Sequence, residues 1–305
     1  MQEGKKHSVC AVVVTYNRLE LLKHCVEALR AQSAGCDILI VDNASTDGTA
    51  RWAAGQQDCH YRNTGSNLGG AGGFNRGMRW AVEAGYEFVW IMDDDTLPKP
   101  DALEKLLEAD RALEGSYGWL SSVALWTDGG ECKMNRQKLE KHCCENRILL
   151  RNGLVRAKQA TFVSLFLPVG TICKFGLPIT EFFIWGDDLE FTRRVALRGK
   201  MPCFLAGQSQ VIHATGNNEG SNIALDAPER IGRYFYAFRN EAYLYRQEGL
   251  KGRAYCFAKR CRDFLRIAKT GKPRLPRLGV LLRGIWAGAF FRPDVEYLNR
   301  NEEQE

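Results

Sequence analysis

Residues 9–18 read VCAVVVTYNR, and this stretch decides the fold. Its first six residues are apolar and mostly β-branched, which predicts a buried strand over residues 8–14. Two further runs of this kind, DILIV at 37–41 and EFVWIM at 87–92, predict a second and a third strand. Because predicted helices follow these strands, the pattern indicates βαβ units and a parallel sheet.

Each of the three strands runs into a polar cluster. The clusters are TYNR at 15–18, DNASTDGT at 42–49 and DDDT at 93–96. Ligands of parallel sheets bind beyond the carboxyl ends of the strands, so we expect the three clusters along one edge. Further helices are predicted over 19–32, 78–83, 101–113 and 188–198, and further strands over 203–205 and 210–212. Ser45 or Thr46 is predicted to cap the helix that follows the second strand.

The composition is that of a globular protein. The chain has 305 residues, of which 45% are apolar and 26% charged, and this balance argues against disorder. The longest uncharged stretch, 159–173, is shorter than the roughly 20 apolar residues of a membrane-spanning helix. The 11 cysteines include no CxxC pair, so we expect reduced thiols. Cys132, His142, Cys143 and Cys144 do not have the spacing of a structural zinc site.

Positive charge is concentrated near the C-terminus. Eleven basic residues and one acidic residue lie between 251 and 283, which gives this segment a charge of +10 and leaves −4 elsewhere. Apolar residues at 278, 281, 282, 285, 286 and 290 recur beside these charges at helical spacing. Two interpretations stay open: a helix on an anionic membrane surface, formed by residues 251–290, or a core-packing helix with a solvated basic face.

The triplet Asp93-Asp94-Asp95 follows an apolar strand. Adjacent carboxylates raise one another's pKa, and a cation relieves that repulsion. Mg²⁺ is commonly held by one or two carboxylates together with substrate phosphates. A solvated turn is the alternative, but the position at the carboxyl end of a buried strand favours a metal site.

Three other motifs carry chemistry. The glycine-rich run NLGGAGGFNRG at 67–77 permits close approach of the backbone to a ligand, although it is not a dinucleotide fingerprint. The acidic run WGDDLE at 185–190 can supply a general base, or a helix cap. His213 follows a predicted strand, and imidazole is a common metal ligand.

Six motifs occur in a fixed order over about residues 9–217: VVVTYNR, VDNASTDGT, NLGGAGGFNRG, IMDDDTLP, FFIWGDDLEF and VIHATG. Together they resemble the family 2 glycosyltransferases, and the MDDD form is more similar to the bacterial galactofuranosyltransferases than to the rhamnosyltransferases. The resemblance implies an α/β fold of the GT-A type, with a Rossmann-like, mixed, mostly parallel sheet flanked by helices. We expect a catalytic domain at 1–227 and a helical, basic region at 228–305 on the acceptor or membrane side.

The resemblance also implies roles by position. It implies that Asp93, Asp95 and His213 hold a divalent ion, Mn²⁺ or Mg²⁺, and that Asp94 faces the donor sugar. It implies Asp188 as the base, with Asp187 as the alternative. The residues implied for the nucleotide pocket are Thr15, Tyr16, Asn17, Arg18, Asp42, Asn67, Gly69, Gly70, Gly72 and Gly73. It implies Trp185 for the acceptor side. Apart from the resemblance, six residues further along the chain are candidates for contact with either the acceptor or the diphosphate: Arg230, Arg233, Tyr234, Tyr236, Arg239 and Asn240.

The expected activity is the inverting, metal-dependent transfer of a galactofuranose- or rhamnose-class sugar from a UDP- or dTDP-linked donor. The acceptor would be a hydroxyl of a cell-surface glycan or lipid-linked molecule. One alternative, a sugar-nucleotide pyrophosphorylase, requires a Gly-rich basic loop where this chain has TYNR. A non-enzymatic membrane or nucleic-acid binder leaves the acidic clusters unexplained, so we expect no nucleic-acid partner. The expected location is the cytoplasm, or the inner face of the plasma membrane as a peripheral protein.

Overall fold

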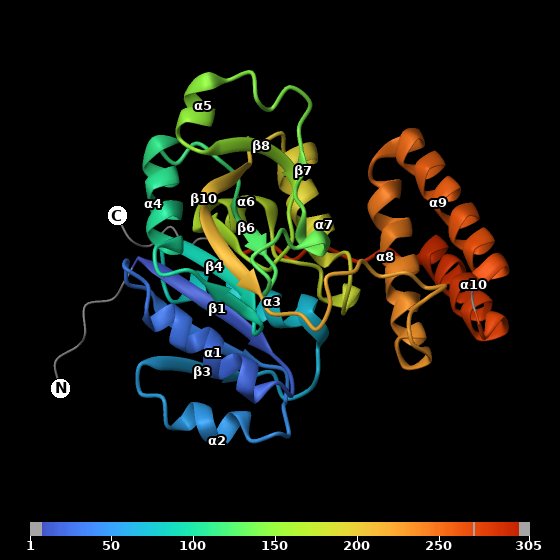
Figure 1. Cartoon of the computed structure of the whole chain (residues 1–305), viewed down its shortest axis with the longest axis horizontal. Helices are drawn as coiled ribbons and strands as arrows, with labels where there is room; N and C mark the ends of the chain where they lie inside the picture. The colour runs from blue at the N-terminus through green and yellow to red at the C-terminus, as the bar shows by residue number, and fades with distance from the viewer. Residues whose placement is uncertain (1–7, 271, 299–305) are drawn as a thin grey trace.

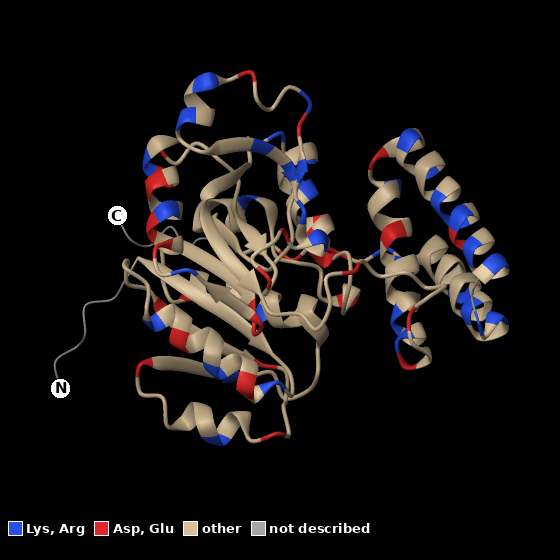
Figure 2. Ribbon diagram, viewed as in Figure 1, with Lys and Arg blue, Asp and Glu red and all other residues tan. Residues whose placement is uncertain are grey.

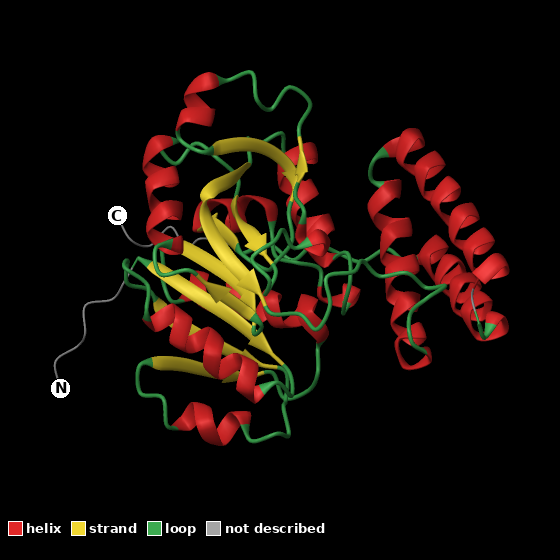
Figure 3. Ribbon diagram, viewed as in Figure 1, coloured by secondary structure: helices red, strands yellow, loops and turns green. Residues whose placement is uncertain are grey.

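A mixed β-sheet with helices on both faces forms the body of the protein, and three helices stand beside it (Figure 1). The structure is a computed structural model that describes residues 8–270 and 272–298. The strands are β1 (Val9–Thr15), β2 (Asp37–Asp42), β3 (Cys59–Asn63), β4 (Phe88–Asp93), β5 (Thr96–Pro98), β6 (Leu120–Leu125), β7 (Lys138–Leu139), β8 (Leu154–Gln159), β9 (Leu165–Pro168) and β10 (Phe204–His213). The helices are α1 (Leu19–Arg30), α2 (Thr49–Ala54), α3 (Gly69–Glu83), α4 (Ala102–Ala112), α5 (Arg147–Arg151), α6 (Val169–Phe175), α7 (Asp187–Arg193), α8 (Tyr234–Arg246), α9 (Gly249–Thr270) and α10 (Arg274–Phe290). Figure 3 shows the strands with helices around them and the group α8–α10 to one side.

The strand order explains why three polar clusters meet. The order is β3-β2-β1-β4-β9-β6-β10-β8-β7, and β5 pairs with β10. β1 lies between β2 and β4 and is parallel to both, with Thr15 opposite Asp42 and Val14 opposite Asp93. The predicted common edge is therefore confirmed. Beyond β4 the sheet is mixed, because β9 is antiparallel to both of its neighbours.

Both faces of β1 are buried, which is why its sequence is apolar throughout. Its odd-numbered residues pack with Leu22 and Leu29 of α1 on one face. Its even-numbered residues pack with Phe74 and Met78 of α3 on the other face. The sheet therefore has a hydrophobic core on each side, and its open carboxyl edge is left for polar residues.

Three local predictions need correction. The strand β3 was not expected, because its sequence CHYRN is polar and half exposed at the end of the sheet. Helix α3 begins at Gly69, nine residues before the predicted start, since glycines at its beginning let it pack closely on β1. The predicted strands 203–205 and 210–212 are one strand, β10, with a shift in register between Ala206 and Gln210.

The predicted cap of α2 at Ser45 or Thr46 is also wrong. The helix begins after Gly48, and Asp47 Oδ1 accepts a hydrogen bond from the Thr49 backbone at 3.2 Å. Ser45 and Thr46 instead bond to Asn17, whose backbone N–H donates to Ser45 Oγ at 2.8 Å. These two residues therefore join the ends of β1 and β2 rather than cap a helix.

The helices α8, α9 and α10 have a core of their own, which includes Tyr234, Phe238, Ile267 and Leu281. After α10 the chain returns to the body, where the Glu296 carbonyl accepts a hydrogen bond from Leu177. Lys and Arg are concentrated along α9 (Figure 2). Among the described residues, no helix combines the length and apolar character that crossing a membrane requires.

Candidate active site

Three consecutive aspartates lie where β4 ends at the carboxyl edge of the sheet. Asp94 and Asp95 are almost fully buried, whereas Asp93 lines a cleft. Thr15 Oγ1 donates a hydrogen bond to Asp94 at 2.8 Å. The Arg18 guanidinium donates to Asp94 at 2.9 Å and to Asp95 at 2.7 Å. The residues at the end of β1 therefore fix two of the three carboxylates.

His213 approaches the same carboxylates from β10. In the antiparallel pair of β10 and β5, His213 lies opposite Thr96, the residue after Asp95. This register places His213 Nε2 3.1 Å from Asp95 Oδ1. Burial lowers the pKa of His213, but the hydrogen bond and charge of Asp95 outweigh burial and raise the pKa above its ordinary value.

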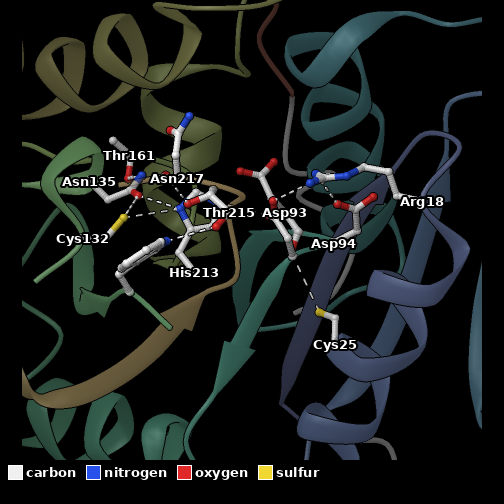
Figure 4. Close-up of polar contacts among 12 residues, drawn as sticks. Arg18, Cys25, Asp93, Asp94, Cys132, Asn135, Thr161, His213, Thr215 and Asn217 are labelled. Carbon is white, nitrogen blue, oxygen red and sulfur yellow. Dashed lines mark hydrogen bonds and ion pairs between the residues drawn. The ribbon is translucent and has the colours of Figure 1, made fainter. Parts of the chain in front are cut away.

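Asp93, Asp95 and His213 can together hold a metal ion. Each offers one ligand atom, and the three atoms lie within 4.8 Å of one another; Figure 4 shows Asp93 and His213 on opposite sides of the gap. Of the residues that the structure describes, this is the one such group of three or more His, Cys, Asp or Glu side chains. Burial, followed by the charge of Asp95, raises the pKa of Asp93 to about 8, and a cation would oppose both effects. Two carboxylate oxygens and an imidazole nitrogen suit Mn²⁺ or Mg²⁺.

Asn135 also belongs to this site, although no motif in the sequence points to it. His213 Nδ1 lies 2.7 Å from Asn135 Oδ1, and Asn135 Nδ2 donates to Thr161 Oγ1 at 3.0 Å. The second bond orients the amide so that its oxygen faces the ring. Because Asn135 Oδ1 can only accept, a neutral His213 carries its proton on Nδ1 and donates it to that oxygen. The lone pair of the ring then lies on Nε2, which faces the aspartates.

A cleft of about 630 Å³ runs from Asp93 and His213 towards the C-terminal helices. Its walls also include Gly70 and Trp185. The two carboxylates of the second acidic motif, Asp187 and Asp188, face the same cleft. Eight of the residues expected from the sequence therefore share one cavity, although segments far apart in the chain supply them: Gly70, Asp93, Trp185, Asp187, Asp188, His213, Arg233 and Tyr234.

Asp187 and Asp188 begin helix α7. Burial raises the pKa of Asp187 to about 8, with the charge of Asp188 as the second cause. Burial also raises the pKa of Asp188, to about 6, and a hydrogen bond from the Leu189 backbone at 2.7 Å opposes that rise. Both carboxyl groups therefore hold a proton to a higher pH than a free aspartate does, and the effect is larger for Asp187, because the charge of Asp188 adds to its burial.

The loop before α7 is strained. Phe183 and Trp185 have φ values of 63° and 64°, in the left-handed region that non-glycine residues rarely adopt. Asn240 of α8 is fully buried, and its Nδ2 lies 2.8–3.1 Å from the carbonyl oxygens of Phe182, Ile184 and Trp185. Asn240 is therefore not the acceptor contact expected from the sequence, because its side chain is used to hold the loop.

Gly69 meets this loop from the other side. Its φ is +70°, and a Cβ atom there would overlap the Phe183 carbonyl. Gly69 thus allows the start of α3 and the strained loop to touch, and the Ala71 backbone donates to the Phe183 carbonyl at 3.1 Å. Gly72 packs on Leu68, whereas Gly70 borders the cleft.

The other residues expected in the nucleotide pocket surround the ends of β1 and β2 and lie outside this cleft. Tyr16 is 42% exposed, and Asn67 Oδ1 accepts a hydrogen bond from Gly69 at 2.8 Å. Asp42 is fully buried, and its oxygens accept hydrogen bonds from Tyr61 at 2.7 Å and from the Ser45 backbone at 2.8 Å. Gly73 packs against Val14 of β1. Asp94 is held by Thr15 and Arg18 and does not border the cleft.

Comparisons with known proteins find relatives of this chain. Residues 10–119 match the family Glycosyl transferase family 2. The chain is 28% identical over 258 residues to galactofuranosyltransferase GlfT1 of Mycolicibacterium smegmatis, which covers 80% of this chain and 84% of that protein. It is 38% identical over 112 residues to undecaprenyl-phosphate mannosyltransferase of Micrococcus luteus, which covers 35% of this chain and 45% of that protein.

A solved structure has the same fold. The mannosyltransferase PcManGT from Pyrobaculum calidifontis, in complex with GDP-Man and Mn²⁺, matches with a TM-score of 0.55 and 15% identity. The match covers 93% of this chain and 88% of that one. The expected α/β architecture of the GT-A type is thereby confirmed. Through the match over residues 10–119, the relatives and the acidic cleft at the carboxyl edge of the sheet, this chain is similar to the family 2 glycosyltransferases.

Proposed function

We propose that this glycosyltransferase moves a sugar of the galactofuranose or rhamnose class from a UDP- or dTDP-linked donor to a hydroxyl of a glycan or lipid-linked acceptor, with a divalent cation and with inversion. The observation that carries the proposal is the convergence of Asp93, Asp95 and His213 on one point of a cleft that also holds Asp187 and Asp188. The similarity to a protein named galactofuranosyltransferase supports the sugar class.

The cation would be held by Asp93, Asp95 and His213, with Mn²⁺ or Mg²⁺ fitting these ligands. Bound there, it would stabilise the negative charge that develops on the departing nucleoside diphosphate. Asn135 would keep the His213 lone pair towards it. Thr15, Tyr16, Asn17, Arg18, Asp42, Asn67 and the glycines at 69, 70, 72 and 73 would surround the nucleotide, and Asp94 would orient Arg18 and the donor side of the site.

Asp188 would take the proton from the acceptor hydroxyl. Its pKa of about 6 leaves it ionised at pH 7, as a general base must be, whereas the pKa of about 8 keeps Asp187 mostly protonated. The hydroxyl oxygen then attacks the anomeric carbon while the bond to the diphosphate breaks on the opposite face. One displacement inverts the anomeric configuration. Trp185 borders the cleft beside these carboxylates and would contact the acceptor.

Donor recognition is tested by thermal unfolding with a panel of nucleotides in Mn²⁺. We expect UDP or dTDP to raise the unfolding temperature, because a ligand at 100 times its dissociation constant adds about 2.7 kcal/mol of stability. ADP at the same concentration is the control and is expected to give a much smaller rise. Equal shifts for all three nucleotides, or none, would contradict the proposed donor class.

The C-terminal helices would attach the enzyme to an anionic membrane surface, placing it at the inner face of the plasma membrane. A groove of about 680 Å³ lies between α8, α9 and α10, and its lining is mostly apolar. Phe257 is 71% exposed there, and Trp286 of α10 is 71% exposed nearby. Leu281 of α10 lies in the core of the three helices, which supports the core-packing alternative for that side of the helix, whereas Arg260 and Arg277 are buried and not part of a solvated basic face.

Vesicle flotation tests this attachment. The double variant Phe257→Ser/Trp286→Ser is expected to lose binding to phosphatidylglycerol vesicles, since it removes exposed apolar area without changing the charge. Phosphatidylcholine vesicles serve as the comparison for the charge contribution. Equal flotation of the variant and the natural protein would remove the membrane role of this surface.

A further inference from the structure

The active-site cleft continues beyond the catalytic carboxylates onto α9. Lys259, Arg262, Asp263 and Arg266 all line it. These positions are spaced by three, four and seven residues, so they lie on one face of the helix. Arg233, which precedes α8, borders the same end of the cleft. One end of the cavity is therefore acidic and the other end basic.

Part of this basic end is neutralised within the protein. Glu241 pairs with Lys259 at 2.5 Å and also with Arg260. Arg260 further pairs with Asp263 at 3.1 Å and is buried. Glu241 and Asp263, the two acidic residues at this end of the cleft, are therefore both already paired with basic residues of the protein.

The positive charges of three arginines, Arg233, Arg262 and Arg266, are not neutralised by these two acidic residues. Arg262 lies 3.9 Å from Asp263, and its side chain is 52% exposed. Arg233 and Arg266 are exposed, and within residues 8–270 and 272–298 neither has an acidic partner within salt-bridge distance. Guanidinium groups present several donors in a planar fork that fits phosphate oxygens. An open cleft wall with three such groups is suited to an anion.

The donor does not account for this anion site. Its diphosphate belongs at the opposite end of the cleft, with the cation of Asp93, Asp95 and His213. Asp188 belongs to α7, which lies between the sheet and the C-terminal helices (Figure 1), and the acceptor hydroxyl must reach it from the side that the donor leaves free. A molecule that extends from Asp188 towards α9 is therefore the acceptor.

We propose that Arg233, Arg262 and Arg266 form an anion subsite that binds a phosphate or diphosphate ester carried by the acceptor. This inference rests on the proposed function, because it assigns the basic end of the cleft to the second substrate of that reaction. It restricts the proposed acceptor class to molecules that carry a phosphate or a diphosphate ester. The three arginines would set the distance between the acceptor's phosphate and the hydroxyl that reacts.

Calorimetric binding of octyl diphosphate tests the subsite without donor or turnover. The titration is done in EDTA, below the micellar concentration, so that the probe meets neither a bound cation nor a micelle. We expect Arg262→Gln/Arg266→Gln to weaken octyl diphosphate binding by about tenfold or more, because two charge-assisted contacts are lost. The matched control, Arg111→Gln/Arg151→Gln, removes two exposed arginines of α4 and α5 and is expected to bind as the natural protein does.

Three results would overturn the proposal. One is equal octyl diphosphate binding by the two double variants. Another is equally tight binding of octyl glucoside, which lacks the phosphates. The third is that Arg262→Gln/Arg266→Gln no longer binds phosphatidylglycerol vesicles but still binds octyl diphosphate as the natural protein does. The arginines would then bind the lipid headgroups of a membrane surface and not the phosphate of an acceptor. Stabilisation of Arg262→Gln/Arg266→Gln by UDP and Mn²⁺ is expected to stay unchanged, so the donor proposal is judged separately.

Discussion

Asp188→Asn is expected to lower kcat by about 10²–10⁴-fold, which is the contribution typical of a general base. Asparagine keeps the size of the side chain and its place at the start of α7, but it cannot accept the proton of the acceptor hydroxyl. The dissociation constant for the donor nucleotide is expected to stay within about twofold, since the residues proposed to surround the nucleotide lie at the ends of β1 and β2 and not beside Asp188. Release of nucleoside diphosphate and calorimetry with UDP and Mn²⁺ measure the two quantities.

Asp187→Asn is the matched comparison, because the two aspartates are neighbours on the same cleft wall. A larger loss of kcat in Asp187→Asn than in Asp188→Asn would exchange their roles. The pH profile gives a second check. Burial raises the pKa of Asp188 to about 6, so the base is protonated and idle below that pH. In the natural enzyme, activity is therefore expected to fall as the pH decreases through about 6.

Asp93→Asn is expected to lower kcat by about 10²–10³-fold, comparable to the loss of one group that stabilises charge in a transition state. The substitution replaces an ionised metal ligand by a neutral one of the same shape. It also removes a buried carboxyl with a raised pKa, so the variant is expected to fold at least as stably as the natural protein at pH 8. Turnover in Mn²⁺ measures the first effect, and thermal unfolding in EDTA, without a bound cation, measures the second.

Asp101→Asn provides the control for this variant, since Asp101 is exposed before α4 and lies away from the cleft. It is expected to keep full turnover. Full turnover of Asp93→Asn as well would show that this carboxylate has no part in the reaction.

The part of the site built from strand ends could be predicted from the sequence. The apolar runs before Thr15, Asp42 and Asp93 identify parallel strands, and parallel strands bring their carboxyl ends to one edge. The short motif around His213 also follows a strand, so its meeting with the aspartates agrees with the expected site. In each case a strong local pattern fixed the position of the residue.

The rest depends on contacts that no local pattern records. Asn135 lies in a segment without regular periodicity, and only the folded chain shows that it faces His213. Asn240 was expected to touch the acceptor or the diphosphate, yet it holds the strained loop. The basic face of α9 was visible only as a count of charges. The packing of α8 and α10 against α9 decides which arginines are neutralised, which are buried and which face the cleft.

Binding of Mn²⁺, followed by the electron paramagnetic resonance signal of the free ion, tests the central claim most directly. The natural protein in the presence of UDP is expected to bind one Mn²⁺ per chain, and Asp93→Asn to bind it at least tenfold more weakly, with Asp101→Asn unchanged. The same Mn²⁺ affinity for the natural protein and Asp93→Asn, or no binding by either, would contradict a metal site formed by Asp93, Asp95 and His213.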